Sequence, residues 1–298
     1  ANTSIVACSS KSFDRAKEFA EKHGIQFFYD SYEKMLQNDM VDAVYIATTH
    51  NFHYENALLC LQFNKHVLCE KIFMVNAKQA REIFKVANEK KLFVMEAIWS
   101  RFLPVNIWAK GQVRDGQIGD VVSVTAQFGV NFPCDPKSRL YDINLAGGGL
   151  LDLGIYPLSF ICNFLGSDPV EVKGVAKFGL TNVDEQASIS LLYDKGQTGS
   201  ATYSMCTNYT NLAVVYGTKG RIEVDHTCFA KSAVLLRDDG IRIEFDDNGT
   251  NGFEYEIKDA VNNILSGELE SKIIPAEDTI NILKICDDLR RQWGFKYP

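Results

Sequence analysis

The sequence has 298 residues, 46% of them hydrophobic and 23% charged, and its 31 Lys and Arg against 38 Asp and Glu give a formal net charge of −7. This composition is ordinary for a globular protein, and the length suggests about two domains. The acidic balance argues against nucleic acid as the main partner. We find neither a signal peptide nor an apolar run near the ~18 to 20 residues of a membrane span, so we expect no membrane partner. Eight cysteines without a CxxC pair predict a reducing compartment, taken as the cytoplasm, and no zinc.

The first third of the chain alternates short apolar runs with amphipathic stretches, which is typical of parallel strands joined by crossover helices. The run AVYIA at 43–47 is apolar throughout and predicts a strand buried on both faces. We predict strands and helices in this order: strand 4–8, helix 13–23, a strand near 27, a helix after Ser31, strand 43–47, helix 53–63, strand 66–69, helix 76–90 and strand 92–95.

After about Ile98 the apolar period changes to strict alternation, which predicts strands with one packed face and one polar face. We therefore expect an antiparallel sheet with helices on one side and an open face that meets water or a partner. The expected strands are 122–128, 187–193 and 201–205, and the expected helices are 149–165, 253–265 and 276–293. With no linker between the halves, we predict two abutting domains, 1–97 for a dinucleotide and 98–298 for substrate binding and dimerisation.

Two segments carry groups that could do chemistry. VLCEKIF places Glu70 and Lys71 directly after a strand, at the edge where open α/β sheets bind ligands. GGGLLDLGIY, residues 147–156, places Asp152 and Tyr156 four apart on one helix face. Taken alone, the first is as well explained by a solvated charge pair and the second by a core aromatic. Together they can meet only in the cleft between the domains.

At these segments the chain resembles the Gfo/Idh/MocA oxidoreductase family, and within it the dimeric dihydrodiol dehydrogenase branch. The resemblance covers the whole chain, and Tyr156 stands where most of the family has His. The matching motifs are RAKEFA (15–20), ATTHNFH (47–53), CEK (69–71), MEAIW-RF (95–102), GGGLLDLGIY (147–156) and GTKG (217–220).

The resemblance implies an NADP-dependent oxidoreductase that transfers hydride between nicotinamide and a hydroxyl of a cyclic diol or a pyranose sugar such as D-xylose. The implied catalytic residues are Lys71, Tyr156 and Asp152. A cation ~4 Å away contributes about 4 kcal/mol at a dielectric constant of ~20, so we expect Lys71 to lower the pKa of Tyr156 and make it a base. The substrate-binding set is Trp99, Arg101, Phe102, Asp152 and Tyr156, with core packing as the alternative for Trp99.

The residues after the first visible strand predict the cofactor. NAD sites place a carboxylate there, whereas this chain has Ser10, Lys11 and Arg15, which suit a 2′-phosphate. A plain surface role is the alternative for Lys11. Because no third ligand accompanies the two histidines of ATTHNFH, we expect them to contact cofactor or cap a helix rather than bind metal. The full cofactor-binding set is Ser10, Lys11, Arg15, Thr48, His50, His53, Glu70 and Lys71.

The chain departs from the family pattern at two places. Ile72 stands where the family has proline, so Lys71 is less restricted. The family's glycine-rich turn and its strand would precede Ser4, and in the strand order 3-2-1-4-5-6 that strand is central. We therefore expect a Rossmann-type domain lacking its first strand and glycine-rich turn, in a natural protein longer by roughly 25 to 30 residues, and a 298-residue chain that cannot bind a dinucleotide normally. Either the strands at Ser4 and Ala43 lack a shared partner, or they pair directly.

Two alternatives to this enzyme remain open at the level of sequence. One is a catalytically silent family member kept as a dimeric binding or structural protein. The other is a different sugar reductase of the same fold. In each case the Ser- and Thr-rich open face of the second sheet predicts a homodimer.

Overall fold

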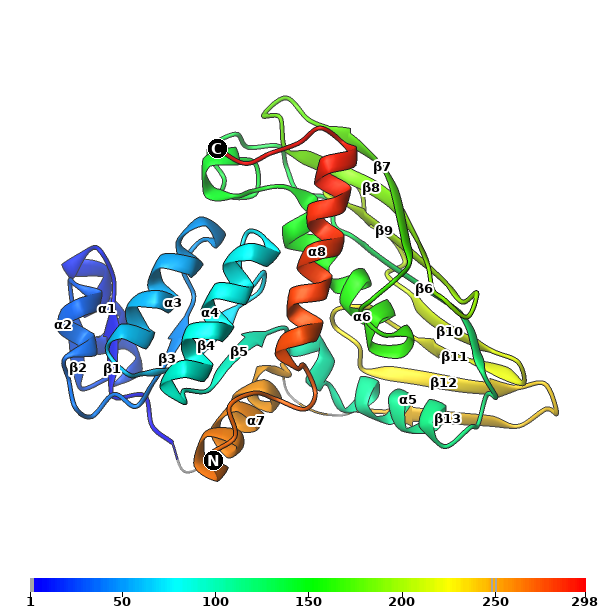
Figure 1. The fold of residues 1–298 in the computed structure, drawn as a ribbon, viewed down its shortest axis with the longest axis horizontal. Helices are drawn as coiled ribbons and strands as arrows, with labels where there is room; N and C mark the ends of the chain where they lie inside the picture. The colour runs from blue at the N-terminus through cyan, green and yellow to red at the C-terminus, as the bar shows by residue number, and fades with distance from the viewer. Residues whose placement is uncertain (1–2, 248, 250) are drawn as a thin grey trace.

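The computed structural model describes residues 3–247, 249 and 251–298. It places short parallel strands with their helices beside one large curved sheet (Figure 1). The strands of the small parallel sheets all lie before Ile98 in the chain, and the large sheet is built from residues after it.

The N-terminal strands form two separate parallel sheets. β1 (Ala7–Ser9) pairs with β2 (Phe27–Tyr29), while β3 (Ala43–Ile46), β4 (His66–Glu70) and β5 (Val94–Ala97) pair in that order. The helices between them are α1 (Phe13–His23), α2 (Tyr32–Leu36), α3 (His53–Gln62) and α4 (Ala77–Lys90). Three of the four begin after a side-chain N-cap, since Ser12, Ser31 and Asn76 each accept a hydrogen bond from the backbone N–H three residues on.

The strands β1 and β3 share no partner. In the described part of the chain β1 pairs only with β2, and β3 only with β4, so direct pairing of the two strands, one of the two outcomes considered above, is wrong. The expectation that 43–47 is buried on both faces is also wrong: Ala43 and Tyr45 are exposed. Side chains two residues apart point to the same face of a strand, so one face of β3, an edge strand, is left uncovered.

The C-terminal sheet has eight strands in the order β13-β12-β11-β10-β6-β9-β8-β7. All neighbours are antiparallel except β6 and β9, which are parallel. The three predicted strands correspond to β6, β8 and β9, and alternation did not reveal the other five. The strands are β6 (Val121–Gly129), β7 (Glu171–Phe178), β8 (Asp184–Leu192), β9 (Thr198–Ser204), β10 (Ala213–Gly217), β11 (Gly220–Val224), β12 (Ser232–Arg237) and β13 (Arg242–Asp246).

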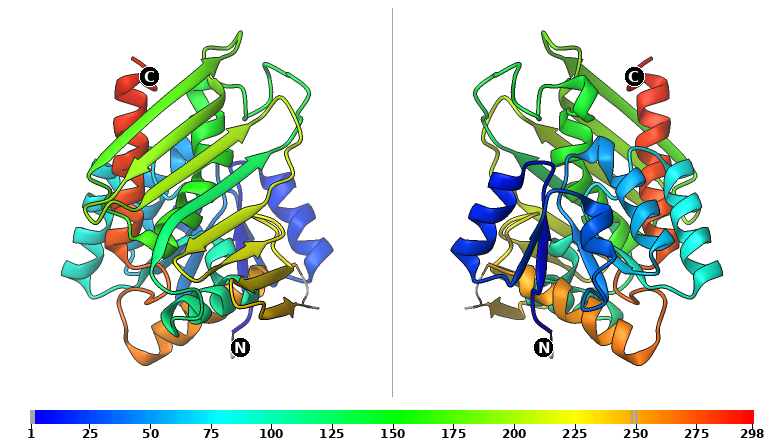
Figure 2. Two further views of the ribbon diagram at one scale, coloured as in Figure 1. Left: turned by 90° about the vertical axis from the view of Figure 1, so that its right-hand side faces the viewer. Right: turned by 90° about the vertical axis from the view of Figure 1, so that its left-hand side faces the viewer.

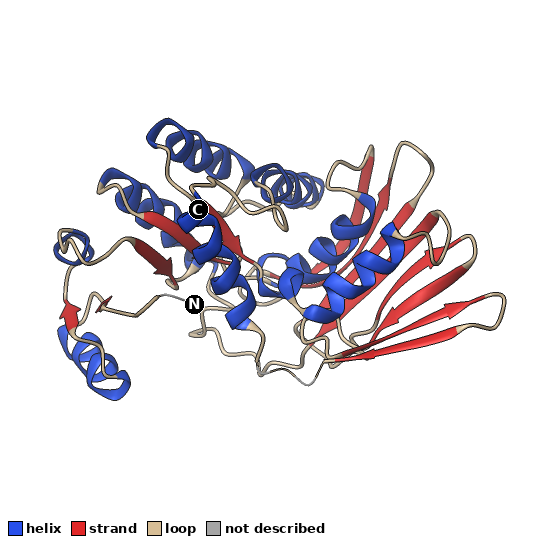
Figure 3. Cartoon of the chain, turned by 90° about the horizontal axis from the view of Figure 1, so that it is seen from below, coloured by secondary structure: helices blue, strands red, loops and turns tan. Residues whose placement is uncertain are grey.

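Helices cover only one face of this sheet. α5 (Pro104–Arg114), α6 (Ile155–Leu165) and α8 (Ala276–Gln292) lie between it and the parallel strands, and α7 (Phe253–Ser266) lies at the end nearest β4 (Figure 1). Within the residues that the structure describes, the opposite face carries no helix (Figures 2 and 3). On it, Val175, Leu192 and Tyr216 are exposed among serines and threonines, as the alternation predicted.

The central helical segment is more apolar than the sequence analysis allowed. Ile143–Leu165 has the length and mean hydropathy, 1.5, of a membrane-spanning helix, yet 94% of its apolar window is buried inside the protein. It includes a π-helical turn at Leu150–Gly154 that leads into α6. Burial against the sheet explains its hydropathy, because a helix enclosed on all sides is apolar all round.

Candidate active site

Lys71 and Asp152 meet where β4 ends against the π-helical turn. Lys71 directly follows β4, and its Nζ donates to Asp152 Oδ1 at 2.9 Å and to the Asp152 carbonyl at 2.8 Å. The Lys71 side chain is 13% exposed and that of Asp152 6%. The two sequence segments singled out above therefore do come together, across the two halves of the chain.

Asp152 is the centre of a small group of charges. Arg139 Nη1 donates to Asp152 Oδ1 at 3.1 Å, and His50 Nε2 lies 3.8 Å from the same oxygen. Burial by itself would raise the pKa of Asp152, but the Lys71 and Arg139 cations outweigh it and hold that pKa well below its usual range. Burial and the Lys71 charge lower the pKa of His50 to about 3. At neutral pH the group therefore consists of two cations, one carboxylate and a neutral imidazole.

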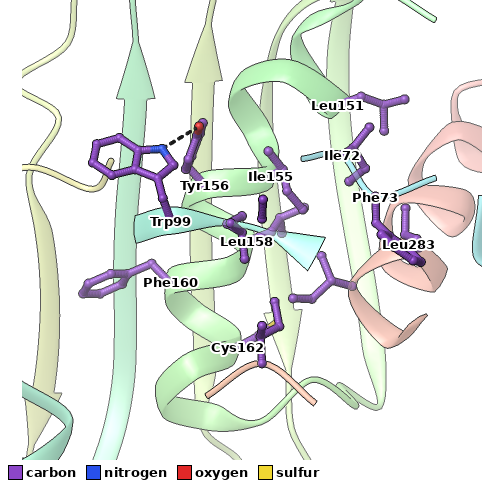
Figure 4. Close-up of a cluster of buried hydrophobic side chains, with 14 of the residues drawn as sticks. Ile72, Phe73, Trp99, Leu151, Ile155, Tyr156, Leu158, Phe160, Cys162 and Leu283 are labelled. Carbon is purple, nitrogen blue, oxygen red and sulfur yellow. Dashed lines mark hydrogen bonds between the residues drawn. The ribbon is translucent and has the colours of Figure 1, made fainter. Parts of the chain in front are cut away.

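The Tyr156 hydroxyl lies beside this group and is enclosed by other rings. Trp99 Nε1 donates to Tyr156 Oη at 3.1 Å (Figure 4). Phe128 packs edge-on against the tyrosine ring at 5.5 Å, and Lys71 Nζ lies over the ring face, 5.1 Å from its centroid.

The expected lowering of the Tyr156 pKa by Lys71 is not found. Burial raises this pKa, and the nearby Cys228 thiol adds to the shift, while the Trp99 hydrogen bond opposes it. The reason is geometric. The Lys71 ammonium donates a hydrogen bond to the Asp152 carboxylate and faces the Tyr156 ring, so it does not stabilise a negative charge on the phenol oxygen. Tyr156 therefore keeps its proton at neutral pH.

Aromatic side chains from the C-terminal half cover Trp99. Its indole stacks on Phe253 at 4.9 Å and contacts Phe229 at 5.1 Å. Phe229 is 54% exposed and Phe253 39%, so both rings reach the surface above the buried Trp99. Phe229 and Cys228 lie in the turn between β11 and β12, held by the Thr227 hydroxyl, which donates to the Gln127 carbonyl at 2.8 Å.

Sequence reasoning missed several of these residues. Cys228, Phe229 and Phe253 lie far along the chain from the residues that they contact, Arg139 lies 13 residues before Asp152, and none of the four is part of a local motif. The sheet order alone brings the β11–β12 turn next to α6, so no local signal could have identified these residues.

The remaining residues predicted to bind cofactor are divided between two places. Glu70 accepts the Tyr45 hydroxyl at 2.6 Å and the Lys71 N–H at 3.1 Å, beside the charge group. His53 is wholly buried, with its ring nitrogens 2.8 Å from the Ile72 carbonyl and 3.0 Å from the Thr48 carbonyl. His53 thus supports the backbone around Lys71 and Thr48.

Ser10 and Lys11 follow the end of β1 and Arg15 lies in the first turn of α1, apart from the Lys71 group. Ser10 Oγ accepts the Ser12 N–H at 3.3 Å, and Lys11 Nζ lies 4.3 Å from the centre of the Phe52 ring. Phe52 follows His50 closely in the chain, so Lys11 connects the end of β1 to the segment after β3. Neither Lys11 nor Arg15 forms an ion pair with any residue that the structure describes.

Arg101 and Phe102, predicted to bind substrate, are not brought to Tyr156. The Arg101 guanidinium is buried and donates to Ser159 at 2.8 Å, Asn163 at 3.2 Å and Asp278 at 3.3 Å. These contacts tie α6 to α8, and Phe102 is buried in the core. Their role toward substrate stays a prediction.

A buried network behind the glycine-rich turn positions Asp152 and Tyr156. Asp184 Oδ2 accepts the Leu150 N–H at 2.5 Å and the Tyr203 hydroxyl at 2.6 Å. Gly148 has φ +119°, and a Cβ there would lie 2.5 Å from Asp184 Oδ1, so only glycine fits. Among the described residues no group of three or more His, Cys, Asp or Glu is placed to hold a metal.

Comparison with known proteins agrees with this fold. Two family models match: "Oxidoreductase family, NAD-binding Rossmann fold" over residues 1–98, and "GFO/IDH/MocA C-terminal domain" over residues 107–223. The trans-1,2-dihydrobenzene-1,2-diol dehydrogenases of Bos taurus and Homo sapiens are each 35% identical to this chain, over 99% of it and 90% of the relative.

Two solved structures share the fold over nearly the whole chain. A 3-ketoreductase from Actinomadura kijaniata, in complex with NADP and TDP-benzene, matches with a TM-score of 0.85 and 28% identity, covering 96% of this chain and 89% of that one. An aldose-aldose oxidoreductase from Caulobacter crescentus, complexed with glycerol, matches with a TM-score of 0.88 and 25% identity over 98% and 90%. The predicted resemblance and fold class are confirmed, and the chain belongs to the GFO/IDH/MocA family of oxidoreductases.

Proposed function

We propose that this protein catalyses NADP-dependent hydride transfer between nicotinamide and a ring hydroxyl of a cyclic diol or a pyranose sugar. The single observation that carries the proposal is the enclosed Tyr156 hydroxyl, which accepts from Trp99 at 3.1 Å beside the Lys71–Asp152 pair. Relatives named as dihydrodiol dehydrogenases, and fold neighbours that act on sugars, support the choice of substrate class.

The chain offers groups suited to both ends of NADP. At the end of β1, Lys11 and Arg15 are cations without a carboxylate partner among the described residues, which fits the 2′-phosphate. At the ends of β3 and β4, Thr48, Glu70 and Lys71 offer a hydroxyl, a carboxylate and an ammonium for the nicotinamide end. When bound there, the cofactor would supply the hydride acceptor or donor.

Tyr156 would hold and move the substrate proton. Because burial keeps Tyr156 protonated, its hydroxyl is ready to donate a proton to a carbonyl oxygen in the direction of reduction. In the direction of oxidation the step runs in reverse, and the phenolate form of Tyr156, after losing its proton to solvent, would receive the alcohol proton. The raised pKa makes Tyr156 a proton donor near neutral pH, whereas the base role expected from sequence needs the phenolate form.

Lys71 and Asp152 would provide an ordered polar surface beside Tyr156. Asp152 accepts a hydrogen bond from Lys71 Nζ at 2.9 Å and so fixes the direction in which the ammonium points. Hydroxyl groups of a diol or sugar can accept from Lys71 and Arg139 and donate to Asp152. Preorganised donors of this kind stabilise negative charge that develops on a substrate oxygen.

The exposed aromatic rings above Trp99 would hold the substrate ring. Phe229 and Phe253 present partly exposed faces at the surface nearest Tyr156. Aromatic faces suit the apolar faces of cyclic diols and sugars. Ring binding at this point would place a ring hydroxyl toward Tyr156.

The test is a panel of cyclic diols and aldoses with NADP+ or NAD+ on the full-length natural protein, followed by the absorbance of the reduced cofactor. We expect turnover with NADP+ and at least one ring hydroxyl, lost in Tyr156→Phe and retained in the surface control Tyr32→Phe. Turnover that survives in Tyr156→Phe would contradict the role of Tyr156. Absence of turnover with every substrate would favour the silent binding protein instead.

We also propose a homodimer formed through the uncovered face of the eight-stranded sheet, and action in the cytoplasm. The dimer is supported by the exposed Val175, Leu192 and Tyr216 on that face. The compartment is supported by the cysteines, since all eight are free thiols within the described residues.

A further inference from the structure

We propose that Glu96 is a positioning residue for Lys71: its buried carboxyl fixes the backbone segment that follows Lys71 against β5 and α8. Its effect on turnover rests on the proposed function, whereas its effect on Lys71 itself does not.

Glu96 joins three elements through its two side-chain oxygens. It lies in β5 and is 2% exposed. Oε1 accepts the Phe73 N–H at 3.0 Å, and Oε2 accepts the Thr279 hydroxyl of α8 at 2.9 Å. Phe73 lies in the same buried cluster as Leu283 of α8 (Figure 4). A single carboxyl thus links β5, the segment after β4 and the last helix.

The bonded N–H is close to Lys71 in the chain. Phe73 is two residues after Lys71, and between them the Ile72 carbonyl lies 2.8 Å from His53 Nδ1. Ile72 has no ring to restrict the backbone, so the segment depends on these hydrogen bonds. The Lys71 ammonium must reach Asp152 from this segment, and a small shift of the backbone would move it.

The charged and titratable groups facing Glu96 come from every neighbouring element. They are Lys71, Arg101, Cys69, Glu256 and Cys286. Burial raises the pKa of Glu96 to about 7, against the smaller effect of its hydrogen bonds and of the Arg101 and Lys71 charges. Both contacts survive protonation, because a protonated Oε2 can donate to Thr279 while Oε1 still accepts from Phe73.

This chemistry defines a matched set of variants. Glu96→Gln keeps an acceptor for Phe73 and a donor for Thr279, so it retains the geometry of the protonated form. Glu96→Ala removes both contacts. Thr279→Val removes only the hydrogen bond from α8 to Glu96, and it replaces Glu96→Ala as the test variant if Glu96→Ala does not fold. Thr279→Ser keeps the hydroxyl and should keep this hydrogen bond.

The first measurement is independent of turnover. Trace acylation of lysine amines, quantified by mass spectrometry, reports how firmly Lys71 is held, with the exposed Lys195 as internal control. We expect labelling of Lys71 relative to Lys195 to rise about tenfold in Glu96→Ala. This corresponds to a loss of about 1.4 kcal/mol from the contacts that keep the Lys71 amine bound to Asp152. It should rise less in Thr279→Val and stay at the wild-type level in Glu96→Gln and Thr279→Ser.

The second measurement is steady-state kinetics over a range of pH. A misplaced Lys71 should lower kcat about a hundredfold in Glu96→Ala, with a much smaller change in KM. Glu96→Gln retains both contacts and should restore most of the kcat lost in Glu96→Ala at every pH of the range.

Unchanged Lys71 labelling in a folded Glu96→Ala or Thr279→Val protein would overturn the proposal. Loss of thermal stability in Glu96→Ala with wild-type kcat would also overturn it, since that result indicates packing alone. If the wild-type protein turns over no substrate, the proposed function fails, and the labelling experiment still decides the role of Glu96.

Discussion

Lys71 Nζ donates two hydrogen bonds to Asp152, one to its carboxylate at 2.9 Å and one to its main-chain carbonyl at 2.8 Å. The pair ties the end of β4 to the π-helical turn that leads into α6. It therefore connects the two halves of the chain at the point where hydride and proton transfer would take place.

Asp152→Asn should destabilise the protein more than Lys71→Met. The first leaves Lys71 and Arg139 without their carboxylate, whereas the second leaves Arg139 still paired with Asp152. Breaking a buried pair from one side costs about 3 kcal/mol of unfolding free energy or more. Urea denaturation should show that the double variant loses less than the sum of the single losses. Additive losses would mean that the pair is not coupled.

Tyr156→Phe and Lys71→Met should each remove most of kcat. Loss of a positioned proton donor costs roughly 10² to 10⁴ in rate. Because Lys71 lies 5.1 Å from the ring centroid of Tyr156 and both would act on one substrate oxygen, the double variant should be little slower than either single variant. Steady-state rates with the best substrate of the panel check this, and multiplicative losses would show that the two residues act separately.

Lys11→Ala should weaken binding of NADP(H) and leave NAD(H) nearly unchanged. A charge-assisted contact to phosphate contributes about 1.5 to 3 kcal/mol, so the affinity should fall tenfold or more. Arg15→Ala should act in the same direction. Fluorescence titration measures both cofactors, with Lys17→Ala as control because Lys17 lies on the exposed face of α1 beside Glu21. Equal affinity of the wild-type protein for the two cofactors would contradict the assignment.

Glu256→Gln should flatten the dependence of stability on pH. Burial, with the Glu70 and Glu96 charges, raises the pKa of Glu256 from 4.5 to about 9. Between these values the folded protein holds a proton that the unfolded chain has lost. The unfolding free energy of the wild-type protein therefore falls as pH rises, by up to about 1.4 kcal/mol per pH unit from this group. Denaturation at several pH values should show that the unfolding free energy falls less steeply with pH in Glu256→Gln than in the wild-type protein. The exposed control Glu268→Gln should keep the wild-type slope.

The protein should sediment at twice 33.4 kDa. Val175→Asp should shift it toward the monomer, since Val175 is 73% exposed on the uncovered face of the large sheet and a carboxylate there would lose its hydration in the interface. Ile107→Asp, an exposed position on α5, is the matched control. A wild-type monomer at micromolar concentration would contradict the dimer.

Local sequence patterns identified the elements that depend on neighbouring residues. The period of the apolar residues marked the helices, and the side-chain caps that the structure shows at Ser12, Ser31 and Asn76 likewise depend on contacts within one turn. The large sheet was predicted only in part. Short strands such as β10 and β13 form by pairing with neighbouring strands of the sheet, and the local pattern of apolar residues does not predict that pairing.

For the candidate site, the sequence by itself determined that Lys71 follows a parallel strand and that Asp152 and Tyr156 share a helix face beyond a glycine-rich turn. Only the tertiary structure decided that Arg139 joins Asp152, that the Cys228 turn reaches Tyr156, and that Lys71 faces the ring rather than the hydroxyl. The direction of the Tyr156 pKa shift was decided there too. A pKa depends on burial and on the placement of charges from distant parts of the chain, and folding alone sets both.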